Sequence, residues 1–126
     1  MRSVLLENEV RELKESLKDG LVSTSIFHKN NGQPIVEYNS ISTSSGAYNN
    51  IVNHTLKIFR EYNLDNIDKY IIFNLEDDKS LIILPLVDYR WAILVDNSRV
   101  KLGVILKVII PNSRKRFEEI IRNGIL

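Results

Sequence analysis

The residues best suited to acid–base or metal chemistry are the two histidines, His28 and His54. A neutral imidazole can accept a proton near physiological pH, and its ring nitrogens are common metal ligands. A catalytic base also needs a partner that orients its ring, and neither histidine has a carboxylate paired with it in the nearby sequence. We therefore interpret both as solvated or interface residues, and the sequence predicts no catalytic residue and no metal ligand.

Two short charged runs could bind ions. The acidic run 76–78 offers carboxylates, but a calcium loop needs alternating acidic residues, a glycine and a distal glutamate. The basic run 114–116 could contact phosphate groups of a nucleic acid or a lipid, yet glutamates follow it at 118 and 119. We interpret the acidic run as the tip of a β-hairpin and the basic run as the solvated first turn of a helix.

Residues 89–91, Tyr-Arg-Trp, place a large aromatic side chain at the entry to a predicted strand. That ring could stack on a ligand or a base, or it could pack in the core or at its rim. The five glycines, at positions 20, 32, 46, 103 and 124, do not have the spacing of a phosphate-binding loop. The sequence therefore predicts no cofactor and no nucleotide-hydrolysing activity of its own.

The composition is that of a soluble globular chain, 126 residues long with 44% apolar and 26% charged residues. Its 17 basic and 16 acidic residues leave a formal net charge of +1, which gives no strong field for holding nucleic acid or a membrane. The absence of cysteine excludes disulfides, thiolate zinc sites and iron–sulfur clusters. The start of the chain lacks the apolar run of an export signal, and no apolar run is long enough for a membrane span, so we expect one cytoplasmic domain over residues 1–126.

The first part of the chain predicts a helix followed by a β-hairpin. Apolar residues at helical spacing predict a helix over residues 3–18. Strands are expected over 21–29 and 33–39, joined by the Asn-Gly pair at 31–32, because both residues of that pair accept positive φ. Pro34 has no N–H group, so the second strand is expected at a sheet edge.

The second part predicts a helix and a meander of three strands. A polar loop leads into a helix expected over residues 46–62. Strands are expected over 68–75, 80–87 and 90–95, and the short turns between them require antiparallel neighbours.

The apolar pattern of residues 100–110 fits both the period of a strand and the period of a helix. Alternate residues are apolar, as in a strand, and an apolar stripe at helical spacing is also present. Pro111 is expected to interrupt any helix here, and Asn112 or Ser113 could cap a final helix that ends near Asn123. The sequence leaves the strand and helix alternatives open for this segment.

These elements predict an α/β protein of the α+β type, in the order α-β-β-α-β-β-β-α. The hairpin and the meander are expected to form one five-stranded antiparallel sheet between helices. The first and last helices would cover one face of the sheet, and the middle helix would cover the other.

The middle helix and the strand after it have surfaces typical of a protein interface. The helix carries few charges, and asparagines 49, 50 and 53 are expected on its outer face, although a chain with 13 asparagines could show this by composition alone. Strand 68–75 is apolar, lacks proline and is expected at a sheet edge, where unpaired backbone groups can bind another strand. The candidate interface residues are Asn49, Val52, Asn53, Leu56, Phe59, Lys69, Tyr70, Ile71, Ile72 and Phe73.

Five pieces of the chain follow one another in a recognisable order. A helix ends at a glycine before a β-branched strand at 19–22, and a strand leads through a Gly turn to Pro-Ile at 28–35. A Ser/Thr-rich loop enters a helix at 40–48, a Pro-Leu step precedes a hydrophobic strand within 81–95, and Leu-Gly opens the tail at 102–103. This ordered set resembles the roadblock family, the dynein light-chain-like domains.

The resemblance implies a roadblock/profilin-like sandwich and a non-enzymatic module that forms dimers. Members of the family pair edge strands and middle helices across a two-fold axis, which here implies a homodimer through strand 68–75 and helix 46–62. Prokaryotic members regulate or scaffold small Ras-like GTPases, so a small GTPase is the expected partner. The resemblance does not decide between GTPase activation and scaffolding, or between a homodimer and a heterodimer. Pro111 departs from the family, whose final helix is usually continuous.

A second hypothesis is a sensor domain of PAS- or profilin-like architecture that binds a small ligand or a peptide. Such a domain also has a central antiparallel sheet, but it needs an internal pocket of about 300 Å³ or more. The apolar residues are sufficient to fill a core instead, so the sequence favours the adaptor. A structural subunit of a larger assembly is a third hypothesis.

Overall fold

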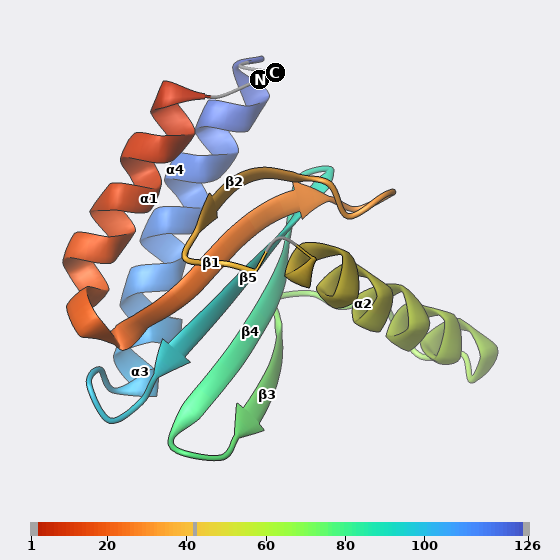
Figure 1. Cartoon of the computed structure of the whole chain (residues 1–126). Helices are drawn as coiled ribbons and strands as arrows, with labels where there is room; N and C mark the ends of the chain where they lie inside the picture. Colours follow the sequence, from red (N-terminus) through yellow and green to blue (C-terminus); the bar gives the residue numbers. More distant parts are fainter. Residues whose placement is uncertain (1–2, 42, 125–126) are drawn as a thin grey trace.

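The computed structural model describes residues 3–41 and 43–124 (Figure 1). In chain order, its elements are α1 (Val4–Leu17), a short 3₁₀ turn (Lys18–Gly20), β1 (Leu21–His28), β2 (Pro34–Tyr38), α2 (Ser44–Glu61), β3 (Ile71–Leu75), β4 (Lys79–Leu86), β5 (Tyr89–Asp96) and a final helix. The final helix comprises α3 (Leu102–Val104), a π-helical segment (Ile105–Ile109) and α4 (Ile110–Arg122). This order confirms the predicted α+β arrangement.

The five strands form one antiparallel sheet in the order β2-β1-β5-β4-β3. β1 pairs with β5 from Leu21↔Val95 to His28↔Tyr89, so the first hairpin and the later meander join through these two strands. β2 and β3 are the edges of the sheet, which confirms the edge position expected for Pro34. Figure 1 shows α1 and α4 side by side on one face and α2 on the other, as predicted.

The larger core lies between the sheet and the α1–α4 pair. The rings of Trp91 and Phe117 meet edge to face, with 5.0 Å between their centroids. The Trp91 indole Nε1 donates a hydrogen bond to Thr24 Oγ1 at 2.8 Å, and that hydroxyl donates to the Ala92 carbonyl at 2.8 Å. Trp91 is completely buried, so it is a core aromatic and offers no face for stacking on a ligand.

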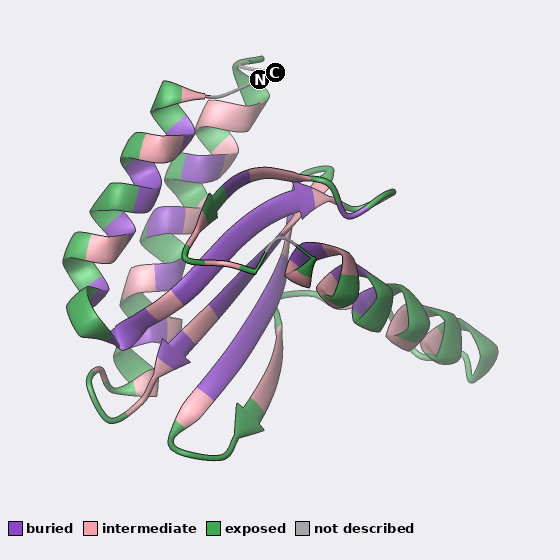
Figure 2. Ribbon diagram, viewed as in Figure 1, coloured by how far each residue is buried: buried purple, intermediate pink, exposed green. Residues whose placement is uncertain are grey.

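A smaller core lies beneath α2. Its buried members are Phe27, Val52, Leu81, Ile83 and Ala92. Figure 2 shows that β1 and β4 are buried along most of their length and that β5 combines buried and half-buried residues, whereas much of α2 is exposed. The α1–α4 side of the sheet is therefore well covered, and the α2 side is covered only in part.

The C-terminal segment is helical, which resolves the alternatives left open for residues 100–110 and shows that the expected interruption at Pro111 is wrong. A proline inside an α-helix lacks an N–H group, and its ring collides with the carbonyl four residues earlier. The chain avoids that collision by widening one turn, in which the Ile110 N–H donates to the Ile105 carbonyl, five residues back. Ser113 is consequently buried inside α4 and does not cap it.

The turns differ from one another in how they accommodate positive φ. Gly32 has a φ of +74°, and a Cβ at this position would lie 3.0 Å from the Gly46 Cα, so the turn needs glycine for both reasons. Asn31 does not have positive φ, contrary to the expectation for an Asn-Gly turn. Val87, between β4 and β5, has a φ of 58°, which is strained for a β-branched residue.

The strain at Val87 generates a stability prediction. Replacing a side chain in the left-handed region by glycine removes a strain of about 1–2 kcal/mol, partly offset by the larger entropy of unfolded glycine. We expect Val87→Gly to raise the free energy of unfolding by about 0.5–1 kcal/mol, measured by urea denaturation. The control, Val108→Gly at an exposed helical position, should lower it by a few tenths of a kcal/mol. A lower stability of Val87→Gly would contradict the proposed strain.

Candidate interaction surface

The exposed edge of the sheet is β3, which pairs only with β4 within the described chain. The strand contains five residues, Ile71–Leu75, so it begins three residues later than predicted, and Lys69 and Tyr70 precede it. It carries no charged residue and no proline, the features with which proteins usually protect such edges. Its outer backbone N–H and C=O groups are therefore available to another strand.

The side chains of β3 divide between the two faces of the sheet. Ile71 and Phe73 pack against the core beneath α2, whereas Ile72 packs against the core beneath α1 and α4. Leu75 is 47% exposed at the end of the strand. The lysine of an Ile72→Lys variant would enter a core. The variant could therefore not separate an effect on edge pairing from an effect on folding.

The expectation that Asn49 lies on the outer face of α2 is wrong. Its side chain is 3% exposed, and its Nδ2 donates to the Lys29 carbonyl at 3.1 Å. Its Oδ1 accepts a hydrogen bond from Arg90 Nη1 at 2.8 Å. Val52 is also buried against the sheet, so Asn49 and Val52 contact their own chain. The exposed Asn53 accepts from the same Arg90 nitrogen at 2.7 Å.

A second apolar stripe on α2 has no partner within the described chain. Ile51, Thr55, Ile58 and Tyr62 recur at i, i+4, i+7 and i+11, so they share one side of the helix. Ile58 is 40% exposed and Tyr62, at the end of the helix, is 73% exposed. We call these four residues the α2 stripe. The sequence periodicity places Ile51 and Tyr62 in one apolar stripe with Val52 and the other α2 residues that face the sheet. The two sets could not be separated from the sequence, because they are adjacent on the helix surface.

Between the two stripes, Leu56 and Phe59 are half-buried. Figures 1 and 2 show α2 beginning over the sheet and extending past it, with its second half largely exposed. Leu94 is only half-buried although its strand is central, which marks sheet surface that α2 leaves partly uncovered. The β3 edge and the α2 stripe thus form apolar surface on the side of the molecule away from α1 and α4.

The remaining candidate groups have structural surroundings. The His28 ring packs against Tyr89 at 4.7 Å, and His54 is exposed on α2. Across residues 3–41 and 43–124, no cluster of three or more His, Cys, Asp or Glu side chains could hold a metal ion. In the same ranges, no helix is both long enough and apolar enough to cross a membrane.

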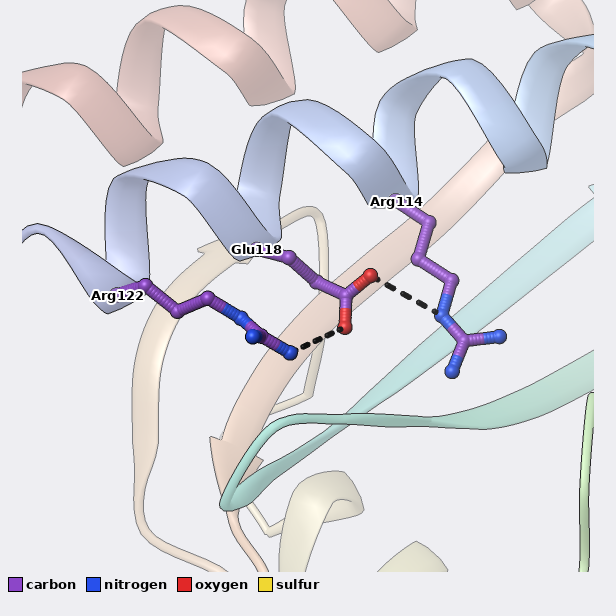
Figure 3. A network of polar contacts seen from close by, with 3 residues as sticks. All are labelled: Arg114, Glu118 and Arg122. Carbon is purple, nitrogen blue, oxygen red and sulfur yellow. Dashed lines mark ion pairs between the residues drawn. The ribbon is translucent and has the colours of Figure 1, made fainter.

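The acidic and basic runs also differ in their surroundings. The acidic run forms the β3–β4 turn, as predicted, with Asp77 and Asp78 at positive φ. The basic run lies inside the C-terminal helix and not in its first turn, so that prediction is wrong, and its two arginines pair with acidic residues of their own chain. Figure 3 shows Glu118 between Arg114 and Arg122, each 3.7 Å away, and Arg116 binds the buried Glu9 of α1.

Solved structures with the same arrangement cover nearly the whole chain. The gliding protein MglB from Thermus thermophilus has a TM-score of 0.76 and 11% identity, over 98% of this chain and 96% of that one. MglB in a tetrameric arrangement has a TM-score of 0.77 and 12% identity, over 100% and 96%. A roadblock/LC7 domain from Streptomyces avermitilis has a TM-score of 0.67 and 9% identity, over 90% and 91%. No family model and no curated protein sequence matches the chain.

The likeness is one of architecture, since the identities are too low to transfer an activity. It covers all the layers described above: the α1–α4 pair, the five-stranded sheet and α2. It also agrees with the order of elements and motifs found in the sequence. The chain therefore has the roadblock/LC7 fold.

Proposed function

We propose that this protein is a cytoplasmic homodimeric module that binds and regulates a small Ras-like GTPase. The observation that carries the proposal is that the unprotected β3 edge and the unpartnered α2 stripe lie on the same side of the molecule. Both features expose apolar or hydrogen-bonding groups that a monomer would leave in water.

A two-fold axis beside β3 would satisfy both surfaces at once. Two antiparallel β3 strands would join the two sheets through backbone hydrogen bonds, and each strand would present the same residues to the other. The α2 stripes would then cover apolar surface of the dimer. This revises the interface predicted from the sequence: Ile51, Ile58 and Tyr62 replace Asn49 and Val52, while Leu56, Phe59 and β3 stay in it. The tetrameric arrangement of an MglB structure supports self-association through this fold.

The GTPase partner is supported by the resemblance of the sequence to roadblock domains and by the likeness of the structure to MglB. We propose that the module acts by binding the GTPase and changing its nucleotide turnover, rather than through a catalytic group of its own. A dimer offers a GTPase a broader platform than one chain, because it combines surfaces of two copies.

The dimer is tested with a charge on the α2 stripe. Ile58 belongs to neither core, so Ile58→Lys should fold normally and place one lysine from each copy in an apolar contact. We expect light scattering to give about twice 14.6 kDa for the wild type and 14.6 kDa for Ile58→Lys at the same concentration. The dissociation constant of the dimer should rise at least about tenfold.

The matched control is Asn50→Lys, which adds the same charge to an exposed position on another side of α2. It should leave the dimer intact. A monomeric wild type would refute the dimer. Dissociation by Asn50→Lys but not by Ile58→Lys would show that the dimer contact lies on another side of α2 and would contradict the assignment to the α2 stripe.

The GTPase partner is tested by affinity capture from the source cells. Immobilised wild type is incubated with lysate containing either GDP or a non-hydrolysable GTP analogue. We expect a Ras-like GTPase, identified by mass spectrometry, to bind in one nucleotide state, and the purified GTPase to hydrolyse GTP at a different rate when the module is added. Retention of no such GTPase in either state would refute this partner while leaving the measured oligomeric state unaffected.

A further inference from the structure

Arg90 is a half-buried cation near the start of β5, the central strand of the sheet. On β5 it lies between Phe27 of β1 and Pro85 of β4, on the face that α2 covers. Burial lowers the pKa of Arg90 from the usual arginine value, because removal from water disfavours the charged form. A cation in such a place normally has a carboxylate partner.

Arg90 has only neutral partners within residues 3–41 and 43–124. Its Nη1 donates to the Asn49 and Asn53 amide oxygens at 2.8 and 2.7 Å, and none of the described carboxylates lies within 4.0 Å. Nε and Nη2 donate to no side chain or carbonyl in the same ranges. The two asparagines hold the guanidinium in place without neutralising it, so its other N–H groups remain available to an anion.

A cavity of about 420 Å³ lies beside Arg90, between α2 and the ends of β3, β4 and β5. Its apolar wall includes Val52, Leu56 and Ile83, and among the described residues no acidic side chain lines it. Lys29 lines it near the turn between β1 and β2, where its ammonium pairs with the exposed Asp88 carboxylate at 3.4 Å. The cavity thus combines one unneutralised cation with an apolar wall, and its volume lies within the range of small-ligand sites.

The cavity is separate from the α2 stripe and also touches the strained turn. Of its α2 residues, Val52 is buried against the sheet, and Leu56 lies half-buried between Val52 and the α2 stripe. Val87, with its φ of 58°, lines the cavity beside Tyr89. Strained residues are concentrated at ligand sites, where the surrounding structure holds them in place.

We propose that this cavity binds a small aliphatic monocarboxylate, whose carboxylate pairs with Arg90 and whose alkyl chain lies along Val52, Leu56 and Ile83. A single arginine suits one carboxylate, because guanidinium and carboxylate can form two parallel hydrogen bonds. A phosphate dianion would call for more free donors, and an amine would meet a like charge. This inference goes beyond the proposed GTPase regulator and requires no GTPase partner.

The test uses hexanoate as the probe, with hexanol and hexylammonium as its neutral and cationic counterparts. Titration calorimetry of the folded chain should show saturable binding of hexanoate only. Arg90→Met keeps the length of the side chain and removes its charge, and it should weaken hexanoate binding by about tenfold to a hundredfold. Arg90→Lys keeps the charge but loses the planar fork, so it should show a smaller loss.

The matched control is Arg99→Met, because Arg99 is exposed and does not line the cavity. It should bind hexanoate like the wild type. The near-ultraviolet circular dichroism of the buried Trp91 checks that each variant is folded, and Arg90→Lys replaces Arg90→Met if the latter is not. In the wild type, the side-chain amide signals of Asn49 and Asn53 should shift as hexanoate is added.

Three outcomes would overturn the proposal. They are the absence of saturable hexanoate binding to the wild type, hexanol binding as tight as that of hexanoate, and equal hexanoate affinities of the folded Arg90 variants and the wild type. A second arm uses N-acetyl-glutamate amide, which carries the carboxylate of a protein side chain. If it binds through Arg90 while hexanoate does not, the occupant is an acidic residue of another protein and the small-acid assignment is wrong.

Discussion

The pairing of β1 with β5 is the contact on which the other layers depend. It joins residues about 70 positions apart in the chain, from Leu21↔Val95 to His28↔Tyr89, and so closes the sheet between the first hairpin and the meander. Successive residues of β5 point to opposite faces, so neighbouring positions serve both sides of the molecule. Trp91 anchors the core beneath α1 and α4, and Arg90, one residue earlier, meets the asparagines of α2.

The two faces of the sheet are covered to different extents, and this difference determines where the molecule can interact. The α1–α4 side is closed by two helices that are joined by the Glu9–Arg116 ion pair and filled by Trp91 and Phe117. The α2 side has one helix that lies over only part of the sheet and continues past it. The β3 edge, the α2 stripe and the cavity beside Arg90 all belong to the less covered side.

Much of this architecture could be predicted from the sequence, because strong periodicities and turn residues mark most elements. The prediction failed where two local rules competed. Residues 100–110 satisfy both the strand and the helical period, and only packing against the core selects the helix. Asparagine is usually solvated, so Asn49 was expected outside. It lies inside because Lys29 and Arg90 supply the partners that bury it at low cost.

The site beside Arg90 could not be located from the sequence, because its parts come from α2, from β3, β4 and β5, and from the segments that connect the elements. The signal was an arginine on a predicted central strand combined with asparagines four residues apart on a helix. Neither feature is informative by itself. The edge strand was easier to recognise, since an apolar run without proline or charge identifies it locally, although its first residue was misplaced by three positions.

The π-helical turn before Pro111 has a consequence for the phase of the whole C-terminal helix. In a regular α-helix each residue turns the chain by about 100°, so residues five apart lie on different sides. The wider turn brings Ile105 and Ile110 to the same side, and both are buried against the sheet. The turn therefore acts as a one-residue insertion that keeps the residues before and after the proline in register with one core.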